Sequence, residues 1–301
     1  MKEIKRIDDL IPAAQKRSRV TVAVAAAGDD AIMQTVHEAA RLNIAEFFLF
    51  GNPDLIKKYG KESGATWLQD KHIIATTNDA EAARLAVEAV RSGKAGAIMK
   101  GQLPTATFLR AILDKENGLR SGRQLSIGGI YDKADGSGVF MITDPAMNVK
   151  PDIMEKKAIL ENGVDLLHRI GMKQPRVAVL CALETVNLDM QDTIDAAILS
   201  KMADRGQIKG CLVDGPLALD IAVSEEGARH KGVTGPVAGH ADLLLTPDIE
   251  AGNMLHKSLH YFAHIECASL VLGASAPVIA TSRSDTVRTK LLSVALGVVT
   301  A

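Results

Sequence analysis

Short runs of β-branched and apolar residues alternate with longer amphipathic segments along almost the whole chain. Residues 20–28, "VTVAVAAAG", are typical of a buried strand, and residues 29–43 carry apolar side chains at helical spacing. This alternation favours a mostly parallel sheet covered by helices, because a helix is the usual crossover between parallel strands. It recurs as a strand at 45–53, a helix at 79–93, a strand at 95–101 and a helix at 104–118.

The second half of the chain repeats the pattern after one interruption. Residues 125–144 hold two short strands around a Gly-Asp-rich turn and predict an antiparallel pair. A long amphipathic helix at 148–171 follows, and strands are expected at 176–181, 208–215, 241–248 and 276–282. We therefore expect two α/β lobes that meet at a cleft, residues 1–147 with 284–301 and residues 148–283, the last helix returning to the first lobe.

Composition excludes several classes of partner. The chain has 301 residues, 47% of them hydrophobic, which is enough for two lobes. Its formal net charge of -1 gives no general attraction to nucleic acid or to an anionic membrane. No signal-peptide pattern or membrane-length apolar run is present, and Cys181, Cys211 and Cys267 are widely spaced. We expect a cytoplasmic protein with buried, unpaired thiols.

The expected strand ends share small residues and cations. Ligands of open α/β sheets bind beyond the carboxyl ends of the strands, where the backbone can approach them closely. Each such loop taken singly also fits an ordinary turn, so the prediction depends on the whole set. The set comprises Gly28-Asp29, Lys100-Gly101, Asp214-Gly215-Pro216, Pro247-Asp248, Glu250-Ala251-Gly252-Asn253 and Ser282-Arg283, with Arg110 and Lys257 as further cations.

The stretch "VIATSRSD" at 278–285 predicts an anion site. A strand built for burial ends there at Ser282 and Arg283, and a buried guanidinium is costly unless an anion or a carboxylate pairs with it. Pairing of Arg283 with Asp285 in a plain helix-entry turn is the competing interpretation.

Two groups of side chains, one of histidines and one of aspartates, have spacings that resemble those of metal ligands. His256, His260 and His264 follow an i, i+4, i+8 spacing, and Asp189, Asp192 and Asp195 resemble a carboxylate cluster. We expect a packed helix face and the acidic first turns of a helix instead, and hence no metal. The chain also has no GxGxxG after its first strand and no P-loop, so no nucleotide cofactor is expected.

Five segments together resemble the phosphate butyryltransferases, relatives of the phosphate acetyltransferases. They include "MKG" and "TATFLR" within 99–110, "LSKMADRGQI" and "DGPLALD" within 182–232, and "EAGNMLHK" within 238–259. Residues 147–153 and 276–285 complete the likeness, which extends from about residue 95 to the C-terminus.

The resemblance implies reversible transfer of a short-chain acyl group between coenzyme A and inorganic phosphate, without a cofactor, by a homodimer. It also implies two lobes of the isocitrate/isopropylmalate dehydrogenase-like fold. Ser282 matches the serine of the family's Ser-Arg motif, which implies a hydroxyl that stabilises the oxyanion or the sulfur. Arg283 would then bind phosphate or the acyl phosphate. Lys100, Gly101, Thr105 and Arg110 would line the site from the first lobe, and Gly252, Asn253 and Lys257 from the second.

The chain departs from the acetyl branch at two places. Thr289 occupies the position of an aspartate thought to accept the thiol proton, and Tyr261 or a near neighbour occupies that of an arginine. Both changes favour the butyryl branch and leave the base unassigned. The alternatives are a phosphate acetyltransferase, a metal- and NAD-dependent hydroxyacid dehydrogenase of the same fold, and a non-catalytic acyl-CoA or acyl-phosphate sensor.

Overall fold

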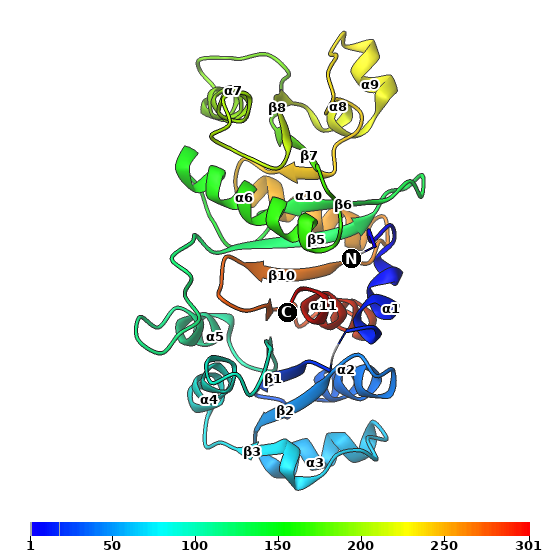
Figure 1. Cartoon of the computed structure of the whole chain (residues 1–301), viewed down its shortest axis with the longest axis vertical. Helices are drawn as coiled ribbons and strands as arrows, with labels where there is room; N and C mark the ends of the chain where they lie inside the picture. The colour runs from blue at the N-terminus through cyan, green and yellow to red at the C-terminus, as the bar shows by residue number, and fades with distance from the viewer. Residues whose placement is uncertain (1, 18) are drawn as a thin grey trace. The chain divides into compact units, whose positions relative to one another are not determined.

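The chain folds into two units, which we name by their place in the sequence. The computed structural model describes residues 2–17 and 19–301 (Figure 1). The central unit holds Gln124–Glu266 with the segment that ends at Ile7, and the terminal unit holds Asp8–Arg123 and Cys267–Ala301. Among the described residues, no helix combines the length and the apolar composition needed to cross a membrane.

The strands of the terminal unit run in the order β3-β2-β1-β4-β11-β10. All neighbouring pairs from β3 to β11 are parallel, and only β10 and β11 are antiparallel. Their bounds are β1 Thr21–Ala25, β2 Glu46–Gly51, β3 Ile73–Ala75, β4 Ala97–Lys100, β10 Ala268–Leu272 and β11 Val278–Ile279. The helices are α1 Leu10–Gln15, α2 Asp30–Arg41, α3 Pro53–Glu62, α4 Asp79–Arg91, α5 Thr105–Ile112 and α11 Val287–Thr300, with short 3₁₀ turns η1 Ile7–Asp9 and η2 Asp70–His72.

Helices cover both faces of these strands. Figure 1 places α4 and α5 on one face and α1, α2 and α11 on the other. α11 packs against α1, α2 and β10, and every residue from Thr289 to Thr300 is buried. A helix that is apolar on all sides is stable only when it is enclosed, so "LLSVALGVVT" needs this position between two layers.

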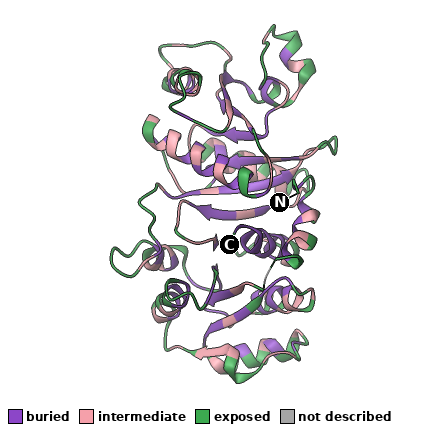
Figure 2. Cartoon of the chain, viewed as in Figure 1, coloured by how far each residue is buried: buried purple, intermediate pink, exposed green. Residues whose placement is uncertain are grey.

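The strands of the central unit run in the order β5-β6-β9-β7-β8. β5 Ser126–Asp132 and β6 Val139–Thr143 form the predicted antiparallel pair, while β9 Leu243–Leu245, β7 Arg176–Leu180 and β8 Leu212–Leu217 are parallel to one another. The helices are α6 Ile153–Arg169, α7 Gln191–Asp204, α8 Leu219–Val223, α9 Glu225–His230 and α10 Ile249–Tyr261. α6 packs on β5, β6 and β9, and α7 on β7 and β8, so that apolar side chains are buried along the strands (Figure 2).

The mostly parallel α/β prediction is confirmed, but the units divide the chain elsewhere than expected. The sequence predicts boundaries near 145–151 and at 283/284. In the structure the chain passes from one unit to the other at 123/124 and at 266/267. The reason is strand pairing. β6 pairs with β9 in parallel, which binds residues 124–144 to the later strands. β11 pairs with β4, which returns residues 267–283 to the terminal unit.

Two strands were not predicted, and the last strand, β11, is much shorter than expected. β3 and β10 are absent from the predicted pattern, and β11 covers only Val278–Ile279 of the expected 276–282. The remaining residues leave the sheet as a loop in which Thr281 is buried and Ser282 to Ser284 are exposed. The expectation of a buried arginine at 283 is therefore wrong, because the strand ends before it.

The three cysteines form no disulfide bond, as expected, but only Cys267 is fully buried. Cys181 and Cys211 are partly buried. Burial raises the pKa of Cys181 to about 12, and nearby Asp192 contributes; burial likewise raises the pKa of Cys211 to about 11. Both thiols therefore stay protonated at neutral pH and are poor nucleophiles.

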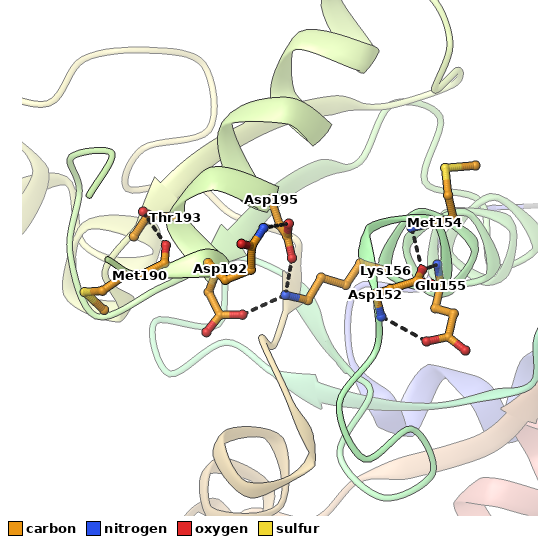
Figure 3. Close-up of polar contacts among 9 residues, drawn as sticks. Asp152, Met154, Glu155, Lys156, Met190, Asp192, Thr193 and Asp195 are labelled. Carbon is orange, nitrogen blue, oxygen red and sulfur yellow. Dashed lines mark hydrogen bonds and ion pairs between the residues drawn. The ribbon is translucent and has the colours of Figure 1, made fainter. Parts of the chain in front are cut away.

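The acidic cluster on α7 has a structural role, although not the one expected. Asp192 and Asp195 accept hydrogen bonds from Nζ of the buried Lys156 on α6, at 2.7 and 2.8 Å (Figure 3). Asp189 precedes the helix, whose N-cap is Met190. Burial lowers the pKa of Lys156, but the hydrogen bonds and charges of the two carboxylates outweigh it and raise the pKa overall. Lys156 and Asp195 therefore form a buried ion pair that joins α6 to α7, and the partly exposed Asp192 adds a second contact to the same ammonium.

We expect Lys156→Met to lower the free energy of unfolding by about 3–5 kcal/mol, because the buried carboxylate of Asp195 loses its cation. Urea denaturation measures the change. Lys201→Met is the matched control: its ion pair with Asp204 is exposed, so its loss is expected below about 1 kcal/mol. Equal effects of the two substitutions would contradict the assignment.

Candidate active site

The carboxyl ends of β1, β4 and β11 lie at one edge of the terminal unit. Lys100, the last residue of β4, is in register with Ala25 at the end of β1. Ile279, the last residue of β11, is in register with Met99. Because the three strands are parallel neighbours, the loops that follow them leave the sheet side by side.

Gly101 allows the β1 and β4 loops to approach each other. Its N–H donates to the carbonyl of Ala25, and the next N–H, of Gln102, donates to that of Ala26, both at 2.8 Å. A Cβ at position 101 would lie 2.2 Å from the oxygen of Ala26, inside any real contact distance. The loop backbone can therefore pack this closely only with glycine.

Lys100 is a buried cation without a carboxylate partner. Its side chain is 5% exposed, and Nζ donates only to the carbonyl of Gly101, at 3.4 Å, among the described residues. Burial lowers the pKa of Lys100, and the positive charges of Arg283 and Lys290 lower it further. These three cations therefore act on one region of space.

Lys290, the third of these cations, was not predicted from the sequence. It lies in the first turn of α11, is 3% exposed, and donates from Nζ to the carbonyl of Asp285. Burial lowers the pKa of Lys290, against the opposite effect of the Asp285 and Asp29 charges. The available signal was a lysine directly before the apolar run at 291–299, because the start of a buried helix can be buried with it, although the neighbouring Arg288 is exposed.

The loop after β11 is held by its own hydrogen bonds. The N–H of Ser282 donates to Oδ2 of Asp285 at 2.7 Å, and the hydroxyl of Ser282 lies 3.0 Å from that of Ser284. Arg283 forms no hydrogen bond or ion pair with any described residue. The carboxylate of Asp285 therefore accepts a hydrogen bond from the backbone and does not pair with Arg283. The competing interpretation, in which Asp285 pairs with Arg283, is wrong. The guanidinium is exposed and available to an anion.

Thr289 lies in the first turn of α11 and is hydrogen-bonded to the N-cap residue. Its N–H donates to Oγ1 of Thr286, the N-cap of α11, at 3.0 Å, and the two hydroxyls are 3.2 Å apart. A hydroxyl so placed has no proton-accepting capacity near neutral pH, so position 289 supplies no base.

Thr105 and Arg110 lie on α5, the helix that follows the β4 loop. Thr105 is its first residue and Arg110 belongs to its last turn, and both are exposed. In the part of the chain that the structure describes, Arg110 contacts neither Lys100 nor the Ser282 loop through a hydrogen bond or an ion pair. A role for either residue stays a prediction.

The other predicted residues form a second group, in the central unit. Gly252 on α10 packs so closely on the turn after β6 that a Cβ would lie 2.5 Å from the carbonyl oxygen of Asp144. Asn253 donates from Nδ2 to the carbonyl of Pro145 at 3.1 Å, and Nζ of Lys257 lies 5.9 Å from the Tyr261 ring centroid. These contacts fix α10 on the turn.

Asp214, on β8, is the last of the predicted residues. Its Oδ1 accepts a hydrogen bond from the N–H of Gly215 at 2.9 Å, and burial raises the pKa of its carboxyl. No hydrogen bond or ion pair between described residues connects it to α10.

The histidine row does not form a single helix face. α10 ends at Tyr261, and His264 lies beyond it with φ of 53°. His256 is hydrogen-bonded through Nδ1 to the hydroxyl of Tyr131 at 2.5 Å, and His260 packs edge-on against Tyr261. The described residues contain no group of three or more His, Cys, Asp or Glu side chains arranged to hold a metal ion.

Comparison with known proteins gives the family. The family model described as "Phosphate acetyl/butaryl transferase" matches residues 69–298. The phosphate butyryltransferase of Clostridium acetobutylicum is 45% identical over 99% of both chains, and the phosphate acetyltransferase of Thermotoga maritima is 43% identical over 93% of this chain and 95% of that protein. A branched-chain phosphotransacylase structure from Enterococcus faecalis matches with a TM-score of 0.80 at 29% identity, covering 93% and 98% of the two chains.

The chain therefore belongs to the phosphate acetyl/butyryl transferase family and is an acyltransferase. The resemblance seen in the sequence is confirmed, and the match extends upstream of residue 95, where only the strand and helix pattern was visible.

We expect the binding of inorganic phosphate to weaken as the pH rises. The loss should occur at a pH below the pKa of an ordinary lysine, which is about 10.4. The charged form of Lys100 attracts the anion, and its lowered pKa brings loss of that charge to a lower pH. Titration calorimetry of wild type and Lys100→Met at a series of pH values measures the difference, since ionisation of phosphate itself is common to both. An identical pH dependence in the two proteins would contradict this assignment. Lys290→Met, tested in parallel, separates the contribution of the second buried lysine.

Proposed function

We propose that this protein transfers a butyryl group reversibly between coenzyme A and inorganic phosphate: butanoyl-CoA and phosphate give butanoyl phosphate and CoA. The observation that carries the proposal is the cluster of Lys100, Arg283 and Lys290, next to Ser282 in the chain, in which none of the three forms an ion pair with a carboxylate of the described residues. Relatives named phosphate butyryltransferase, at 43–45% identity, support the choice of acyl group.

The reaction needs an anion site next to a developing negative charge. An oxygen of phosphate attacks the thioester carbonyl carbon, a tetrahedral oxyanion forms, and the carbon–sulfur bond breaks to release the thiolate of CoA. Arg283 and Lys100 are suited to hold the phosphate, since a guanidinium and an ammonium both favour its charge. The Ser282 hydroxyl is suited to donate to the oxyanion or to the departing sulfur.

Lys290 serves this site through the loop. By donating to the carbonyl of Asp285 it fixes the segment that carries Ser282 and Arg283, and its own charge adds to the field. A concentrated positive field stabilises a thiolate without a proton acceptor. The geometry around Thr289, which supplies no base, is consistent with release of CoA in that way.

The direct test is phosphate-dependent release of thiol from a series of C2 to C5 acyl-CoA substrates. We expect kcat/KM to be greatest for butyryl-CoA. The phosphate acetyltransferase relative of Thermotoga maritima, at 43% identity, makes acetyl-CoA the second candidate. A maximum at acetyl-CoA would change the acyl group and leave the reaction in place; no thiol release with any member of the series would overturn the proposal.

Two substitutions separate the roles of the loop residues. We expect Ser282→Ala to lower kcat about 10²-fold, the usual cost of one oxyanion donor, with little change in the KM for phosphate. Arg283→Ala is expected to raise the KM for phosphate about tenfold or more, because a charge-assisted contact is lost. Ser275→Ala and Arg288→Ala, which alter an exposed hydroxyl and an arginine paired with Asp8, are the controls. Equal effects of controls and test variants would contradict these roles.

We also propose that the enzyme acts in the cytoplasm as a homodimer. Three cysteines that form no disulfide bond support a reducing compartment, and the family resemblance supports the dimer. Light scattering of the purified protein measures its mass in solution, and a monomer would contradict the second part.

A further inference from the structure

A cavity of about 650 Å³ lies in the terminal unit at the edge opposite to the candidate active site. It borders the amino ends of β1 and β2, the last turns of α2 and the segment that leads into β3. Lys100 and Ile279 mark the carboxyl ends of their strands, so the two sites open on opposite edges. The lining residues that matter below are His37, Arg41, Glu46, Trp67, Lys71 and His72.

Two polar atoms of this cavity are buried without a partner. Nδ1 of His37 and Nε1 of Trp67 are shielded from solvent, yet neither has a hydrogen-bond partner among the described residues. A buried donor or acceptor left unpaired costs about 1–3 kcal/mol, so such atoms normally have a partner, a water molecule or a ligand. Both nitrogens belong to residues that line the same cavity.

Aromatic rings form the inner wall. The ring of Trp67 lies 5.4 Å from that of His72 and 6.3 Å from that of Phe47, between centroids. Nδ1 of His72 accepts a hydrogen bond from the N–H of Gln69 at 3.1 Å, so the neutral ring carries its proton on Nε2 and can donate there. Burial lowers the pKa of His72, which favours this neutral form. The wall therefore suits a flat ring with hydrogen-bonding edges.

The outer rim is positively charged. Arg19, Arg41 and Lys71 line the cavity against a single carboxylate, Glu46. Glu46 is 3.0 Å from a guanidinium nitrogen of Arg19, so that pair is neutral. Arg41 is held by Glu38 of the same helix, and Lys71 forms no ion pair with any described carboxylate. The remaining positive charge at an exposed rim suits a phosphate group.

We propose that this cavity binds a nucleoside monophosphate, with the base against Trp67 and His72 and the phosphate at Lys71 and Arg41. A purely apolar ligand would leave the charge of Lys71 without a partner, and inorganic phosphate would leave the aromatic wall unused. Stacking of a base on an aromatic side chain and a charge-assisted contact to phosphate are each large enough to matter. The site is separate from the one proposed for acyl transfer.

Trp67 is the only tryptophan in the chain, so its fluorescence reports on this cavity alone. We expect AMP to change the emission of the full-length protein in a saturable way, adenosine to bind more weakly, and inorganic phosphate to leave the emission unchanged. Equilibrium dialysis with labelled AMP measures binding independently of fluorescence. No saturable AMP binding by either method at millimolar concentration would overturn the proposal.

Matched variants assign the binding to this site. We expect Arg41→Ala combined with Lys71→Ala to weaken AMP binding at least about tenfold, by loss of the phosphate contacts. Arg84→Ala is the control, because Arg84 also pairs with a glutamate of its own helix but lies away from the cavity, and it should bind AMP as wild type does. Binding that is lost in Arg283→Ala and retained in the double variant would place AMP at the other site and overturn the proposal.

Discussion

The parallel register of β1, β4 and β11 is the constraint on which the candidate active site depends. Lys100 is the last residue of β4, and the loop with Ser282 and Arg283 leaves β11 at the same edge. Without the pairing of β11 with β4, these residues, some 180 positions apart in the sequence, would have no reason to meet. The close approach at Gly101 then brings the β1 and β4 loops together.

The buried lysines are of two kinds, which differ in whether the ammonium group has a carboxylate partner. Lys156 has two carboxylates within hydrogen-bond distance, and its pKa is raised. Lys100 and Lys290 are as deeply buried, donate only to backbone carbonyls, and have lowered pKa values. A buried charge that is paired within the protein stabilises the fold. A buried charge that has no such partner is a candidate for binding a charged substrate. The same reasoning separates the acidic cluster on α7, which is structural, from the cations beside Ser282.

Exposure of Arg283 changes how the Ser-Arg pair is understood. The sequence suggested a buried guanidinium that demands an anion. In the structure the guanidinium of Arg283 is exposed and forms no ion pair with a described residue. The buried cation that lacks a partner is the ammonium of Lys100. In the proposed reaction the exposed Arg283 would contact the phosphate first, and Lys100 and the loop fixed by Lys290 would form the preorganised part of the site.

The sequence by itself determined the α/β class, the antiparallel pair at 125–144, the family and the small, cation-bearing loops at strand ends, because periodicity, turn residues and long motifs are local properties. Tertiary structure decided which strands pair, and therefore where the chain divides: β6 belongs with β9 and β11 with β4. It also decided that Lys290 joins Lys100 and Arg283, and that Trp67 shares a cavity with His37. Those groupings depend on side chains distant in sequence meeting in space, which no local pattern encodes.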